Sequence, residues 1–143
     1  MWTTKTGEPV GMVMCYMAHA GRFWLCLTES RARVPAIRRD PRSCICISSA
    51  GTDMKNGKAI TYKGTTQVHA HDASAVRGWF LEAFARRLHR GNEASRIASI
   101  AADLDILERV VFEFTPSKVI SYDGDELAAT VPGIDGGFDR LFA

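Results

Sequence analysis

Short apolar runs separated by turn residues fill the first half of the chain, and this spacing most limits what the chain can fold into. The run Val10–Met17 follows a Gly-Glu-Pro sequence, and after Ala18–Gly21 a second apolar run covers Phe23–Leu27. Two such runs across a glycine-containing turn predict a β-hairpin. Because the runs are apolar on both sides, we expect both faces to be covered, as in a barrel that packs on a helix or a second subunit.

Two further strands are predicted before the chain becomes helical. Ser43–Ser49 is a third short apolar run, and Ala59–His69 alternates between two faces along its whole length. The charged stretch Glu29–Arg42 lies between the second and third runs. It predicts a short helix that Ser30 caps and Pro41 ends.

The second half of the chain predicts two helices and then two strands. Apolar residues recur at helical spacing after Asp72 until Gly91, and a second helical pattern covers Ile97–Leu104. The remaining predicted elements are strands at Arg109–Thr115 and Lys118–Asp123 joined at Pro116, an exit turn at Asp123-Gly124, and an irregular tail from about residue 130. Six antiparallel strands with flanking helices favour a small barrel whose exposed edges a dimer would cover.

Composition narrows the functional classes. The chain has 143 residues, which we expect to form one domain over 1–143, and a formal net charge of +2, too small to indicate a nucleic-acid partner. Its start has no signal-peptide pattern and no segment is a membrane span, so a cytoplasmic location is the default expectation. The four cysteines form no C-x-x-C pair, which predicts free thiols and no metal site.

One short stretch has the makings of an anion site. Thr28 and Ser30 offer hydroxyl groups at the end of the second strand, and Arg31 and Arg33 add positive charge at the start of the following helix. Backbone N–H groups at a helix start, hydroxyls and guanidinium groups together favour a phosphate. The remaining arginines of the stretch are interpreted as a solvated helix face: Arg38, Arg39 and Arg42.

The order of these segments resembles the pyridoxamine 5′-phosphate oxidase-like family of FMN-binding split β-barrels, including its flavin- and deazaflavin-dependent branch. The resemblance covers roughly residues 7–127. It rests on the opening GEPVGMVM at 7–14, GRFWLCLT at 21–28, RRDPR at 38–42, AITYKGTTQV at 59–68 and VVFEFTPSKVISYDG at 110–124. The helix that usually precedes the first strand and the oxidase's C-terminal W-x-L-x-P motif have no counterpart here, so pyridoxamine-phosphate oxidation itself is not expected.

The resemblance implies a homodimer with the cofactor at the subunit interface and a function as a flavin- or deazaflavin-dependent oxidoreductase. FMN is the expected cofactor and the deazaflavin coenzyme F-420 the alternative. The cofactor would exchange a hydride with an unidentified small substrate, and no catalytic acid or base is required of the protein. The cofactor-binding residues implied by the resemblance, together with their neighbours on the same strands, are Met12, Val13, Met14, Leu27, Thr28, Ser30, Arg31, Arg33 and Lys63.

A second hypothesis is a non-enzymatic cofactor-binding or haem-handling split barrel. His69 and His71 at the end of the fourth predicted strand motivate it, because haem needs an axial ligand. The simpler interpretation of these two residues is a pair of surface histidines before a helix. A third hypothesis, nucleic-acid binding through residues 31–42, lacks aromatic residues within the basic segment.

Overall fold

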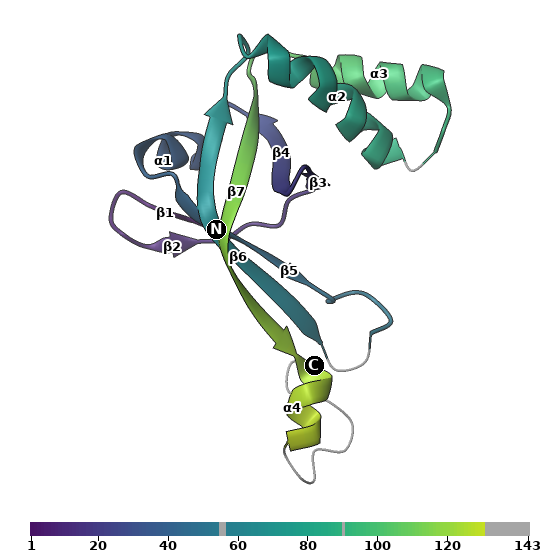
Figure 1. Ribbon diagram of the computed structural model, residues 1–143. Helices are drawn as coiled ribbons and strands as arrows, with labels where there is room; N and C mark the ends of the chain where they lie inside the picture. The colour runs from purple at the N-terminus through teal and green to yellow at the C-terminus, as the bar shows by residue number, and fades with distance from the viewer. Residues whose placement is uncertain (55–56, 90, 131–143) are drawn as a thin grey trace.

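The computed structural model describes residues 1–54, 57–89 and 91–130. Figure 1 shows long strands in the middle, a pair of helices packed at one end and a narrow arm at the other. Over these residues the elements are β1 (Trp2–Thr3), β2 (Pro9–Val10), β3 (Met17–His19), β4 (Arg22–Thr28), α1 (Arg33–Arg39), β5 (Arg42–Ser48), β6 (Lys58–His69), α2 (Ser74–His89), α3 (Ala94–Leu104), β7 (Arg109–Asp123) and α4 (Gly124–Thr130).

The main sheet is entirely antiparallel, with the strand order β3-β4-β7-β6-β5, and β1 and β2 form a separate small hairpin. Strands β6 and β7 are the longest and pair with each other from Lys58 to His69. Their upper halves lie beside β4, whereas their lower halves leave the barrel with β5 and form the arm. The predicted antiparallel, barrel-like arrangement is therefore present.

Both faces of β4 are buried, as its two-sided apolarity predicts. Leu25 and Leu27 face the barrel interior, where they pack with Val34 and Ile37 of α1 and with Phe112 of β7. The opposite face is covered by α2 in a second cluster. That outer cluster consists of Trp24, Phe80, Leu81, Phe84 and Val111.

The predicted hairpin is confirmed at its turn but is shorter than expected. Ala20 and Gly21 both have positive φ angles, 50° and 72°, which is the geometry of a two-residue hairpin turn. The ladder between β3 and β4 begins only at Met17, so residues 11–16 of the predicted strand have no regular secondary structure.

The prediction that Pro116 separates two strands is wrong. Strand β7 is continuous from Arg109 to Asp123, because Pro116 lies opposite Gly64 where the register of β6 shifts by one residue. A proline without an N–H is tolerated at such a bulge. Two short N-terminal strands bring the number in the described segments to seven instead of six.

Three other local predictions differ in detail from the structure. Helix α1 ends before Pro41 as predicted, but its N-cap residue is Ala32, and no side chain caps it, so the capping role of Ser30 is wrong. The predicted exit turn at Asp123-Gly124 is instead the start of α4. The helices predicted after Asp72 and around Ile97 are present as α2 and α3, and the predicted irregular tail lies mostly outside the described residues.

A buried carboxylate joins three strands beneath α2. Glu113 of β7 accepts a hydrogen bond from Arg22 of β4 and contacts His69 Nε2 of β6 at 2.6 Å. The His69 side chain is only 12% exposed, so the interpretation of a surface histidine is wrong for this residue, whereas His71 is exposed.

We expect Glu113→Ala to lower the free energy of unfolding by about 2 kcal/mol, because it leaves His69 without its buried partner. Urea unfolding followed by circular dichroism measures the change. Glu82→Ala is the matched control, since the exposed pair of Glu82 with Arg86 on α2 is expected to contribute less than about 0.5 kcal/mol. Equal effects of the two substitutions would show that the buried carboxylate is not a stabilising link.

Candidate functional site

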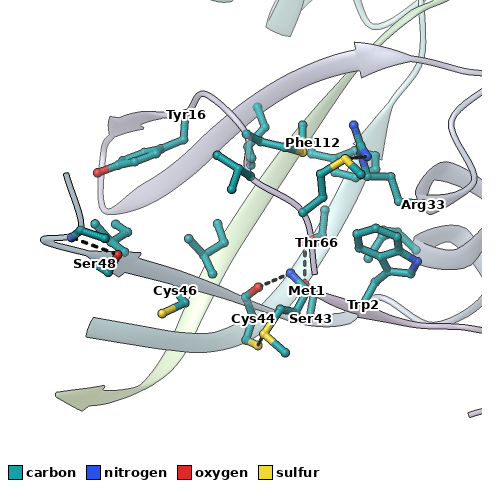
Figure 2. A pocket seen from close by; sticks show the side chains of 18 residues that line it. Met1, Trp2, Tyr16, Arg33, Ser43, Cys44, Cys46, Ser48, Thr66 and Phe112 are labelled. Carbon is teal, nitrogen blue, oxygen red and sulfur yellow. Dashed lines mark hydrogen bonds between the residues drawn. The ribbon is translucent and has the colours of Figure 1, made fainter. Parts of the chain in front are cut away.

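A cavity of about 540 Å³ opens between α1, β5 and the segment 11–16, and this volume is in the range of small-molecule sites. Its floor consists of side chains from the barrel interior, including Leu25 and Phe112. Figure 2 shows Arg33 and Trp2 at one end of the cavity and Tyr16 and Ser48 at the other. The walls are mainly apolar, so the few polar groups decide what can be held.

Arg33, the first residue of α1, supplies the cavity with a positive charge that no carboxylate neutralises among the described residues. Its Nη1 donates to the sulfur of Met12 at 3.3 Å, and the guanidinium carbon lies 5.9 Å from the centre of the Trp2 ring. Its Nε is buried with no hydrogen-bond partner. Burial, with a smaller contribution from Arg31, lowers the pKa of Arg33 from its ordinary value. A buried donor without an acceptor favours an anionic ligand at this point.

Two hydroxyl groups add to the polar part of the cavity. Ser43 of β5 and Thr66 of β6 line it, and their oxygens lie 2.7 Å apart in a shared hydrogen bond. Thr66 is buried. The sequence analysis did not select either residue, although the alternation of Ala59–His69 places Thr66 on the same face as Val68, which packs on the interior cluster.

The segment Gly11–Tyr16 forms one wall of the cavity. Met14 and Tyr16 pack against the interior cluster, whereas Val13 is 99% exposed. None of the main-chain groups of residues 11–16 forms a hydrogen bond within the described residues. The segment therefore offers free amide and carbonyl groups beside the cavity.

Four of the nine predicted cofactor-binding residues line this cavity: Met12, Val13, Met14 and Arg33. The other five do not. Leu27 is buried in the interior cluster, and Thr28 ends β4, where its hydroxyl accepts a long hydrogen bond of 3.5 Å from Ser30. Arg31 and Lys63 are exposed, the latter on the arm strand β6 opposite Cys44.

The remaining arginines of residues 31–42 have partners in the protein. Arg38 forms a bidentate pair with Glu29, and Arg42 pairs with Asp40, whose pKa the hydrogen bonds from Arg42 lower to about 2. Arg39 donates to the carbonyl of Thr3. These contacts agree with a structural role, although they are ion pairs and not merely solvated side chains.

Two searches for other site types returned nothing among the residues described. No cluster of three or more His, Cys, Asp or Glu side chains could hold a metal ion there. The same part of the chain contains no helix with the length and apolarity that a membrane crossing needs.

Comparison with solved structures defines the class of fold. A conserved hypothetical protein of Mycobacterium tuberculosis superposes with a TM-score of 0.72 at 16% identity, over 97% of this chain and 82% of that one. The haem storage protein HutZ of Vibrio cholerae gives 0.67 at 12% identity, over 87% and 85% of the two chains. A candidate pyridoxamine 5′-phosphate oxidase of Listeria innocua gives 0.58 at 12% identity, over 84% and 83%.

These similarities establish a split β-barrel of the pyridoxamine 5′-phosphate oxidase-like type, the fold that the resemblance in sequence predicts. Identities of 12–16% carry the fold and not the activity. No protein-family model matches the chain, and no curated protein matches it either.

Proposed function

We propose that the chain binds the monophosphate of FMN at Arg33 and acts as a flavin-dependent oxidoreductase. The observation that carries this proposal is the buried guanidinium of Arg33, which has no anionic partner among the described residues and a donor without an acceptor. A phosphate would accept charge-assisted hydrogen bonds from it. Solved structures with the same fold include one named for a flavin-type oxidase activity, which agrees with the proposal.

The rest of the cavity suits a flat apolar ring. Met12 and Met14 offer adaptable thioether side chains for its faces, and Phe112 lies on the floor. Free amide groups of residues 11–16 would donate to the polar edge of the ring. When bound, the flavin supplies the hydride chemistry, and the protein's residues hold and shield it.

FMN is favoured over coenzyme F-420 because the cavity has a single unpaired guanidinium group. One phosphate monoester satisfies one such group, whereas the long anionic tail of F-420 needs a basic groove. Within the described residues Arg38, Arg39 and Arg42 have partners and are not available to form it. The substrate of the reaction is not specified by these contacts.

The site is proposed to be completed by a second copy of the chain. The arm presents large apolar side chains on both faces, because Val119 pairs with Tyr62 on one face and Ile120 with Thr61 on the other. Such side chains normally find a partner. The exposed ones are Ile60, Val119, Ile120 and Tyr122. Lys63 lies on this arm, so a dimer could bring its amine to the partner's cofactor.

We expect Ile120→Asp to weaken self-association at least about tenfold, because it would bury a charge in the subunit interface. Sedimentation at several protein concentrations measures the shift from dimer to monomer. Leu88→Asp is the matched control, since Leu88 is 41% exposed against 46% for Ile120 but lies on α2, away from the arm. A protein that is monomeric without any substitution would refute the proposed dimer.

The decisive experiment on the function is a titration of the purified protein with FMN, followed by flavin fluorescence and the visible spectrum. Saturable binding of one flavin per chain, followed by bleaching of the bound flavin with a hydride donor such as NADPH, is the expected result. A colourless protein that binds neither FMN nor F-420 in parallel titrations would rule out the proposal.

A haem-handling role is the second candidate, favoured by the fold it shares with HutZ. His69 is a poor axial ligand in this structure, since its Nε2 is held by Glu113 beneath α2. His71 is exposed and remains available. A Soret band on haem addition that His71→Ala abolishes would support this role, and the absence of any band would exclude it.

A further inference from the structure

Two thiols face each other at the open end of the β3–β4 hairpin. The ladder pairs His19 with Arg22 and Met17 with Trp24. Two residues further along each strand, the same register places Cys15 opposite Cys26. Both are free thiols.

The two side chains lie on the same face of the hairpin. The Tyr16 ring contacts the Phe23 ring on the cavity side, with 5.7 Å between the ring centres. Because side chains alternate along an extended segment, Cys15 and Met17 point to the opposite face. On that face Met17 and Cys26 both pack against the outer cluster beneath α2.

Cys15 and Cys26 have different surroundings. Cys15 is exposed, whereas Cys26 is half-buried. Burial raises the pKa of Cys26, and the proximity of Cys15 raises it further. Cys15 is therefore the thiol that a dissolved oxidant reaches first, and Cys26 the one positioned to react with its product.

We propose that Cys15 and Cys26 form a redox-active pair whose disulfide fastens the cavity wall 11–16 to β4. In the first step the Cys15 thiolate attacks a peroxide oxygen, which gives a sulfenic acid and releases water or an alcohol. In the second step the Cys26 sulfur attacks the sulfenic sulfur, the S–S bond forms, and water leaves with the Cys26 proton. Two thiols together lose two electrons, and the peroxide is reduced.

The local main chain can accommodate this bond. Opposed residues of an antiparallel pair have Cα atoms about 4.5–5.5 Å apart, a separation that a disulfide spans. The observed ladder ends at Met17, so residues 15 and 16 must move onto β4 for the bond to close. Their main-chain groups form no hydrogen bonds that would oppose this movement.

The effect on the cavity rests on the proposed function. Met12, Met14 and Tyr16 lie on the segment that the disulfide would fix, and all three line the cavity. Ordering this wall in advance removes part of the entropy cost of binding, so we expect the oxidised protein to bind FMN about tenfold more tightly than the reduced protein.

The thiol pair can be tested without any cofactor. The reduced full-length chain is treated with a small excess of hydrogen peroxide, and its free thiols are counted before and after. Two of the four thiols should be lost, and peptide mass mapping should find Cys15 linked to Cys26. Amide hydrogen exchange of residues 14–16 should slow on oxidation and recover with dithiothreitol. Linkage of any other pair, or oxidation without a linkage, would overturn the proposal.

Two variants and a second measurement make the test specific. Cys15→Ser and Cys26→Ser should each prevent the loss of the thiol pair, whereas Cys46→Ser, which removes another exposed thiol, should leave it unchanged. Equal FMN affinity of the oxidised and reduced forms would overturn the control of the cavity by the disulfide. A disulfide that forms in a protein with no FMN affinity in either state would instead count against the proposed function alone.

Discussion

Replacing Arg33 with alanine is expected to weaken FMN binding by about 1–3 kcal/mol, which corresponds to roughly 10- to 100-fold in the dissociation constant. The substitution removes the positive charge in the cavity that no carboxylate neutralises over the described residues, and with it the buried Nε that lacks an acceptor. Quenching of flavin fluorescence on titration with protein measures the affinity. Circular dichroism should be unchanged, because Arg33 is half-buried at a helix end and not part of the apolar core.

The neighbouring arginine provides the matched control. Arg31 has the same side chain two residues earlier, but it is exposed and does not line the cavity. We expect Arg31→Ala to change FMN affinity less than twofold, and Arg33→Lys to recover only part of the affinity because an ammonium group lacks the planar fork of donors. If Arg31→Ala were as damaging as Arg33→Ala, the phosphate would lie outside α1 and not within the cavity.

The strands could be predicted from the sequence wherever local chemistry decides their limits. The alternation of Ala59–His69 and the Ala20-Gly21 turn need no distant partner to be recognised, and both are present. Pro116 misled the prediction because its consequence depends on a residue far away in the sequence. A proline ends a strand only where its missing N–H is needed, and the shift of register at Gly64 removes that need.

The candidate site could be predicted only in part, for a related reason. Arg33 and the segment 12–14 were identified from the sequence and do meet at one cavity. Ser43 and Thr66 join them only because β5 and β6 pair in one particular register, with Ser43 next to Gly64. The burial of His69 likewise arises from Glu113, which lies 44 residues further along the chain. Contacts of this kind follow from topology, which short-range patterns do not contain.

Gly64 is the residue at which a single added methyl group is expected to disturb the fold most. A Cβ atom built there would lie 2.1 Å from the carbonyl oxygen of Thr115 and 2.9 Å from the ring of Phe114. The first of these neighbours is main chain and cannot rotate away, so the two central strands would have to separate. Phe114 is itself fully buried, which leaves no space on the other side.

We therefore expect Gly64→Ala to lower the free energy of unfolding by at least about 3 kcal/mol, measured by urea unfolding. Gly78→Ala is the control with the opposite sign. Gly78 lies inside α2 with no atom within 4 Å of an added Cβ, so alanine there should stabilise the protein by about 0.5–1 kcal/mol through helix propensity. If both variants unfolded like the parent protein, the close approach of β6 to β7 would be refuted. The bend that separates the barrel from its arm would then need another cause.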